Sequence, residues 1–248
     1  MEKTDIVKSH KEAESILKFH VNGVNFKMIK VEGGTFTMGE TSEQGDDAWG
    51  DEQPAHQVTL SDYYIGETVV TQELWEAVMG ADPSYTKGPK KPVVKVSWYD
   101  IVNDFLPNLN ALTGKNFTLP SEAQWEFAAR GGNKSQGYKY SGSNNIDDVA
   151  WYGESTRGSI HPVGRKSPNE LGIYDMSGNV KEWCSDWKGP YSAEAQTNPT
   201  GPASGFDRVL RGGSYFCDDT FCRVSFRDSY GPSGRNNVGY GFRLVLDL

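Results

Sequence analysis

The sequence predicts an α+β domain that is rich in loops, with small twisted sheets and two or three helices. Helical periodicity is confined to the first half of the chain, short aromatic or apolar runs typical of strands recur, and turn residues are frequent. Among 248 residues there are 28 glycines and 12 prolines. A chain of this length can bury an adequate core without disulfides, and we expect one main domain.

Residues 1–26 are expected to form a helical extension, and the main domain then covers residues 27–248. In the stretch 6–20, the apolar residues fall roughly on one helical face. These residues are Ile6, Ala13, Ile16, Leu17 and Phe19. Asn22 and Gly23 follow, and an Asn-Gly pair predicts a turn between this helix and the next strand.

Short apolar runs predict the strands of the main domain. They lie at residues 26–31, 35–38, 57–65, 149–153 and 243–246. Residues 41–56 are acidic and contain glycine. Because their carboxylates lack a recognised cation-ligand spacing, we expect a solvated loop in preference to a cation site.

Three helices are predicted in the middle of the chain. Thr71 can cap the first, which ends near Met79. The second covers residues 100–112 and is interrupted by Pro107. The third follows Ser121, which opens a capping box, and it ends at a pair of glycines.

Charge and cysteine content restrict the partners and the compartment. The formal charge is -8, and no run of Lys and Arg offers the concentrated basic surface that a nucleic acid needs. No stretch approaches the ~20 apolar residues of a membrane helix. The first residues are charged where a signal peptide is apolar, so we expect a cytoplasmic protein unless a leader has been removed. Cys184, Cys217 and Cys222 do not make a disulfide framework.

Residues 215–240, called here the variable segment, have an unusual composition. They contain no Glu, Lys, Gln, Trp or Met, although these five types make up 51 of the 248 residues. The types that are present are all encoded by codons reached from an Asn codon when only its adenines are replaced. A glycine-rich loop would lack some of the missing types anyway. The composition nevertheless indicates a segment that is diversified at adenines.

Several blocks of sequence resemble one family in the same order. The blocks are KMIKVEGGTFTMG (27–39), HQVTLSDYYIGETVVTQELW (56–75), LPSEAQWEFAARGG (119–132), DMSGNVKEWCSDW (175–187), DRVLRGGSY (207–215) and GFRLV (241–245). Over about residues 27–246 the chain resembles the formylglycine-generating-enzyme, or sulfatase-modifying-factor, family. This resemblance implies a C-type-lectin-like fold with long loops at a ligand-binding end. The fold hosts both oxidases and non-catalytic proteins, so the variable segment must decide the function.

One function implied by the resemblance is copper-dependent oxidation of a substrate cysteine to formylglycine. The enzymes bind Cu(I) between two cysteines spaced as Cys217 and Cys222 are here, and soft thiolates suit that ion. The residues that follow in the enzymes, an Arg-Tyr-Arg element and an Asn-Thr-Pro-Asp run, are missing, and Lys181 replaces the usual Trp. We therefore do not favour catalysis, and Cys222 is interpreted as a buried packing residue.

The favoured function is a non-catalytic ligand binder that resembles the variable proteins of diversity-generating retroelements. Such proteins keep a constant scaffold and vary residues near the C-terminus, and Tyr, Ser and Asn suit adaptable binding faces. The predicted face consists of Tyr215, Phe216, Asp218, Asp219, Thr220, Phe221, Phe226, Asp228, Ser229, Tyr230, Ser233, Asn236, Asn237 and Tyr240. The alternative is that some of the phenylalanines are core, and we expect at least half of the aromatics to be exposed. The resemblance implies a protein ligand and a bacterial cell-surface location, and we favour a monomer.

The resemblance also implies a calcium site in the block DMSGNVKEW. Asp175 and Glu182 would give carboxylate oxygens, while Gly178 and Val180 would give backbone carbonyls. Oxygen ligands from one tight turn suit Ca²⁺. The alternative is a turn that the same carboxylates stabilise without metal.

Overall fold

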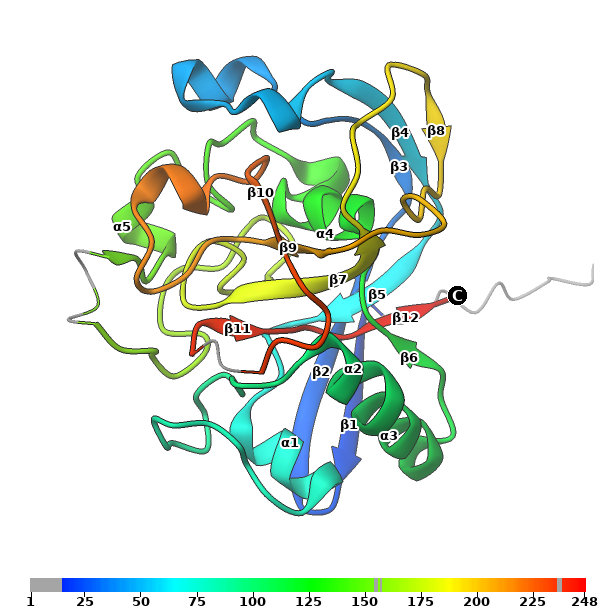
Figure 1. The fold of residues 1–248 in the computed structure, drawn as a ribbon, viewed down its shortest axis with the longest axis vertical. Helices are drawn as coiled ribbons and strands as arrows, with labels where there is room; N and C mark the ends of the chain where they lie inside the picture. The colour runs from blue at the N-terminus through cyan, green and yellow to red at the C-terminus, as the bar shows by residue number, and fades with distance from the viewer. Residues whose placement is uncertain (1–14, 154–155, 157, 236–237) are drawn as a thin grey trace, which may run out of the picture.

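The computed structural model describes residues 15–153, 156, 158–235 and 238–248. Its largest sheet is antiparallel and has five strands in the order β1-β2-β5-β12-β6 (Figure 1). Their bounds are β1 (Ile16–Val21), β2 (Val24–Val31), β5 (Tyr63–Gly66), β12 (Val245–Asp247) and β6 (Phe117–Thr118). The last strand of the chain therefore pairs between two strands from its first half.

Two smaller sheets complete the β structure in the described residues. The four-stranded sheet has the order β10-β9-β7-β11, and the three-stranded sheet has the order β3-β4-β8. Their bounds are β10 (Arg227–Tyr230), β9 (Arg208–Arg211), β7 (Lys181–Trp187), β11 (Tyr240–Gly241), β3 (Gly34–Met38), β4 (His56–Leu60) and β8 (Gln196–Thr197). The variable segment leaves the four-stranded sheet after β9 and re-enters it as β10 and β11, at its two edges (Figure 1).

The three predicted helices are confirmed. They are α1 (Gln72–Met79), α3 (Leu106–Thr113) and α4 (Glu122–Ala129), with two short helices, α2 (Trp98–Asp100) and α5 (Ile146–Val149). Thr71 caps α1, and Ser121 makes the capping box of α4. A π-helical turn, η3 (Ile101–Phe105), links α2 to α3. Pro107 lies in the first turn of α3, where its missing N–H is tolerated.

The predicted N-terminal helix is wrong from Ile16 onward, because residues 16–21 form strand β1. Asn22 and Gly23 have φ angles of 46° and 88°, the left-handed values of a tight hairpin turn, and they join β1 to β2. Alternate residues of β1, including Leu17 and Phe19, pack against the core. Residues 1–14 of the expected extension lie outside the described residues.

Two strand predictions also need correction. Residues 57–65 divide at Ser61 into β4 and β5, which belong to different sheets. Residues 149–153 are not a strand, since α5 ends at Val149 and Trp151 makes only an isolated bridge to Gly178. An apolar run of this length does not by itself separate a strand from a buried turn.

The core lies on both faces of the four-stranded sheet. Neighbouring residues of β9 point in opposite directions: Leu210 joins a cluster around Trp75 and Phe242, whereas Val209 joins a cluster around Trp125. This sheet is therefore covered on both sides, and its edges carry the variable segment. No helix in the described part of the chain is long and apolar enough to cross a membrane.

Candidate ligand-binding surface

Four arginines in and around the variable segment are buried, and each is paired with a glutamate. We call Arg211, Arg223, Arg227 and Arg243 the frame arginines; none is more than 3% exposed. Buried charges are stable only when they are paired and hydrogen-bonded, and bidentate Arg–carboxylate pairs do this well. The frame arginines therefore attach the segment to the rest of the domain.

Two frame arginines share one carboxylate at the start of α4. Arg227 donates to both oxygens of Glu122, at 2.6 and 2.7 Å, and Arg211 donates to the same residue at 2.8 Å. Arg211 also donates to Glu126 at 2.5 Å. Burial opposes ionisation of Glu122, yet Arg227 and Arg211 lower its pKa to about 2. Glu122 is thus ionised at neutral pH.

The other two frame arginines each hold a carboxylate in a bidentate pair. Arg223 donates to Glu52 at 2.6 and 2.8 Å, and Arg243 donates to Glu182 at 2.6 and 2.7 Å. Ser225 donates its hydroxyl to Glu52 as well. Burial raises the pKa of Glu52, but Arg223 and Ser225 outweigh it and lower the pKa below its usual value.

The acidic loop is not the solvated loop that the sequence predicts. It folds into two short 3₁₀ turns, η1 (Ser42–Asp47) and η2 (Gly50–Glu52). Within it, Gln44 and Glu52 are fully buried. The reason is that Glu52 is the counter-charge of Arg223, which is 171 residues away in the sequence. The loop therefore docks against the variable segment.

Exposed and buried positions are interleaved along the variable segment. Ten of the predicted residues are exposed or partly exposed, and we call them the exposed set. They are Tyr215, Phe216, Asp218, Asp219, Thr220, Phe221, Asp228, Ser229, Tyr230 and Ser233. Four of the six predicted aromatics belong to this set. Asn236 and Asn237 lie outside the described residues.

Phe226 and Tyr240 were predicted on the binding face, but the structure buries them, at 3% and 7% exposure. Phe226 packs edge-on against Phe221 at 5.0 Å between ring centroids. Tyr240 packs against Trp183 at 5.8 Å. Both residues therefore support the face from beneath, as the core alternative allowed for some of the phenylalanines.

Trp49 belongs to the same surface, although the sequence did not indicate it. Its ring is 50% exposed and lies 5.7 Å from Phe221 and 5.5 Å from Phe226, both edge-on. The only signal in the sequence was a tryptophan inside a polar loop. Lys181, noted as a departure from the family, forms an ion pair with Asp228. Residues outside the variable segment thus shape its surface.

The two cysteines are buried and free. Cys222 is fully buried in an apolar cluster with Tyr140 and Ile146, and burial raises the pKa of its thiol. Cys217 is 8% exposed, and its Sγ lies 3.1 Å from Oγ of Ser214. Cu(I) bound between the sulfurs would displace the thiol protons, because the thiolate is the metal ligand. The burial of Cys222 is compatible with the packing role predicted for it, and copper binding stays a prediction.

The calcium prediction finds little support in the geometry. Glu182 already accepts from Arg243 with both oxygens, and Oε2 also accepts from Nε1 of Trp125 at 2.8 Å. Asp175 accepts from the backbone of Gly164 at 2.7 Å. A cation there would have to share Glu182 with a guanidinium, so these carboxylates fit the metal-free turn better. Among the described residues, no group of three His, Cys, Asp or Glu could hold a metal ion.

The sheets, the short helices and the long loops define a C-type-lectin-like fold of the sulfatase-modifying-factor type, as predicted. A family model described as "Sulfatase-modifying factor enzyme 1-like domain" matches residues 17–248. The chain belongs to this family.

Its relatives differ in their named roles. The chain is 34% identical to a protein named chaperone protein LppX from Paenibacillus barcinonensis, with 90% of each chain covered. It is 32% identical to a formylglycine-generating enzyme from Streptomyces coelicolor, covering 89% of this chain and 90% of the enzyme. Among solved structures, Treponema denticola variable protein 1 matches with a TM-score of 0.86 and 33% identity, covering 95% of this chain and 100% of that one.

Proposed function

We propose that this chain is a non-catalytic ligand-binding protein with a diversified C-terminal face, of the kind produced by diversity-generating retroelements. The observation that carries this proposal is the interleaving in the variable segment. Buried anchors such as Arg223 and Arg227 are fixed by distant glutamates, while the exposed set makes up the surface between them. The similarity to a variable protein over 95% of this chain supports the same proposal.

The binding face combines the exposed set with Trp49. Phe216 and Tyr230 are 47% and 44% exposed, so they offer aromatic contact area without further rearrangement. Exposed aromatics with short polar neighbours are typical of surfaces that bind proteins. We propose a protein ligand and, with the family resemblance, display on a bacterial cell surface. Trp49 would give every variant the same aromatic contact beside the varied positions.

A display library tests the proposal without knowledge of the natural ligand. Five members of the exposed set, namely Phe216, Asp218, Thr220, Tyr230 and Ser233, are randomised, and the library is selected against lysozyme as the probe. A matched library randomises five exposed residues around α3, namely Asn103, Asp104, Asn108, Ala111 and Leu112. We expect folded binders from the first library and fewer from the second. Loss of folding, or equal yields from the two libraries, would contradict a dedicated binding face.

The copper oxidase is kept as the second function, because the cysteine spacing and the similarity to the Streptomyces coelicolor enzyme favour it. The protein is incubated with copper, oxygen and a Cys-x-Pro-x-Arg peptide, and the peptide mass is measured. We expect unmodified peptide. Formylglycine that forms with the natural chain and not with Cys222→Ala would reverse the ranking of the two functions.

A further inference from the structure

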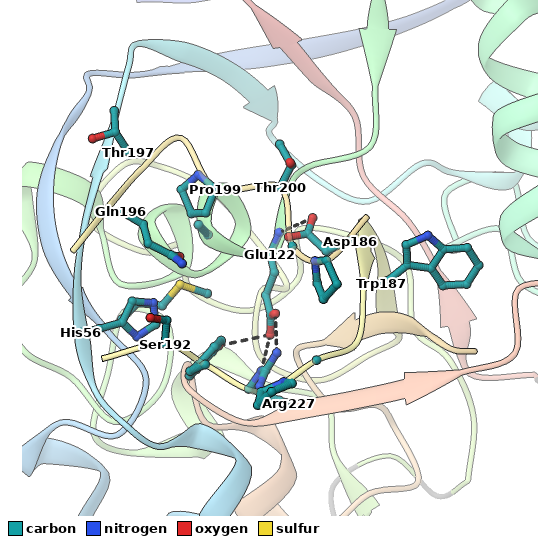
Figure 2. Close-up of a pocket in the computed structure, with 17 residues that line it drawn as sticks. His56, Glu122, Asp186, Trp187, Ser192, Gln196, Thr197, Pro199, Thr200 and Arg227 are labelled. Carbon is teal, nitrogen blue, oxygen red and sulfur yellow. Dashed lines mark hydrogen bonds and ion pairs between the residues drawn. The ribbon is translucent and has the colours of Figure 1, made fainter. Parts of the chain in front are cut away.

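A cavity outside the proposed binding face lies at the end of the molecule that β4 and β8 form. It is a cavity of about 510 Å³, lined by the start of α4, by β4 and by the loop around β8 (Figure 2). Its size is within the range of small-molecule sites. The cavity lining contains one residue of the variable segment, the frame arginine Arg227, and no member of the exposed set. A ligand here would not compete with the proposed binding face.

The carboxylate at the floor of the cavity is paired with two guanidinium groups, although Nε of Arg211 has no hydrogen-bond partner among the described residues. Glu122 accepts from Arg211 and Arg227, and the hydroxyl of Tyr191 donates to it at 3.2 Å. Arg227 also donates to the carbonyl of Asp51, and its guanidinium stacks on Tyr191 at 3.7 Å. The charged groups of the floor therefore pair with one another and leave little for a ligand.

Two acceptor atoms beside this floor remain unpaired. Asp186 is 4% exposed; its Oδ2 accepts from the backbone N–H of Glu122 at 3.0 Å and from Ser185 at 2.9 Å. Its Oδ1 has no hydrogen-bond partner among the described residues. His56 donates through Nδ1 to the carbonyl of Pro54 at 3.0 Å, so in the neutral ring Nε2 is an acceptor. Figure 2 shows Asp186 and His56 on opposite sides of Glu122.

No cationic side chain forms an ion pair with Asp186 among the described residues. The ionisable groups that face it are Glu122, Cys184, Arg227 and Arg208. Nε of Arg208 has no hydrogen-bond partner among the described residues. Arg227 is held by Glu122, and the guanidinium of Arg208 lies against the Trp187 ring, 3.5 Å from its centroid, and donates to the carbonyl of Ser185. Burial, assisted by Glu122, raises the pKa of Asp186 to about 7. A positive group in the cavity would stabilise the ionised carboxylate.

The remaining wall combines apolar side chains with neutral polar groups. It is made by Met38, Trp187, Pro190, Pro199 and Pro202, with neutral polar groups such as Gln196 and Thr200. We infer that the cavity binds a small organic amine whose ammonium donates to Oδ1 of Asp186, while its carbon chain packs against the prolines and Trp187. An anion would meet Glu122 and Asp186 with no uncommitted cationic side chain in the lining.

Three small probes of similar size test the inference: n-butylammonium, n-butanol and butyrate. Binding to the whole chain is followed by NMR, using the indole N–H signal of Trp187. We expect butylammonium to bind more tightly than butanol, and butyrate to bind least. Asp186→Asn keeps the shape and an acceptor for the N–H of Glu122, and it should weaken amine binding at least tenfold. Asp104→Asn, the same change on an exposed turn, should have no effect.

The pH dependence is a second readout that does not rely on the variant. Because burial raises the pKa of Asp186 to about 7, amine binding should be tighter at pH 8 than at pH 6 and should release a proton at pH 6. His56 also lines the cavity, and a positive charge on its ring would weaken amine binding at the lower pH, so the comparison is repeated with His56→Gln. Absence of amine binding, equal affinity for butyrate, or unchanged binding by a folded Asp186→Asn variant would each overturn the inference. If the Asp186→Asn variant unfolds, the natural chain alone still tests the inference. An affinity for butylammonium that does not change between pH 6 and pH 8 would overturn it.

Discussion

The frame arginines and the exposed set lie in the same short stretch of chain, yet they differ in almost every physical respect. The frame arginines are buried and paired with glutamates from distant elements, whereas members of the exposed set such as Phe216 and Tyr230 face solvent. The predicted binding face left out all four arginines, but the sequence did not show that Arg223 and Arg227 are fixed by buried ion pairs. The comparison teaches that, under the proposed function, the variable segment must also carry its own attachments, and we expect these positions not to vary.

The largest expected effect comes from breaking a frame pair. Arg223→Met leaves Glu52 buried without its counter-charge. We expect a loss of about 3–5 kcal/mol in the free energy of unfolding, measured by urea denaturation. The double variant Arg223→Met with Glu52→Met should recover much of that loss, because no unpaired charge remains. A single variant as stable as the natural chain would show that the pair does not hold the segment.

The next effect compares two phenylalanines that the sequence treated alike. Phe226→Ala removes a ring that is 3% exposed, and we expect a loss of about 3 kcal/mol. Phe216→Ala removes a ring that is 47% exposed and should change stability by less than about 0.5 kcal/mol. Both are measured by thermal and urea unfolding. Equal losses of stability in the two variants would contradict the distinction between the buried supporting ring of Phe226 and the exposed ring of Phe216.

A third test contrasts paired and unpaired buried carboxylates. Asp175 makes no ion pair with the described residues, and burial raises its pKa from 3.8 to about 6. The folded state therefore binds the proton of the Asp175 carboxyl more tightly than the unfolded state does. The contribution of Asp175 to the free energy of unfolding is greatest below pH 3.8 and is lost as the pH rises through 6. Asp175→Asn should gain stability relative to the natural chain, by roughly 2–3 kcal/mol between pH 4 and 8. A difference that does not change with pH would contradict the raised pKa.

The smallest effect concerns calcium at the same turn. Because Arg243 already neutralises Glu182, we expect millimolar Ca²⁺ to leave the unfolding temperature unchanged relative to EDTA. Mg²⁺ serves as the control for ionic strength. A rise specific to Ca²⁺ and absent from Asp175→Asn would show that the family calcium site is retained.

Local signals in the sequence predicted much of the fold. Thr71 and Ser121 cap their helices as expected, because a cap involves only the next few residues. The family blocks predicted the fold class. The strand β1 was missed because its apolar residues also fit a helical face, and the Asn-Gly turn was the stronger evidence for a hairpin.

The candidate site could be predicted only in part. The exposed set followed from composition, but the burial of Phe226 depends on Trp49, which lies far away in the sequence. The role of Glu52 depends in the same way on Arg223. Pairings between distant elements leave no periodic or short-range pattern, so one sequence does not reveal them.

The central claim is that variation is confined to the exposed set, and the DNA around the gene tests it most directly. We predict that the DNA near the gene contains a near-copy of the segment that encodes residues 215–240. The copy and the gene should differ within the codons of the exposed set, and the copy should have adenines at the differing bases. The codons of Arg223, Ser225 and Arg227 should be identical in the two copies. Differences spread equally over these three codons, or the lack of any such copy, would contradict the account.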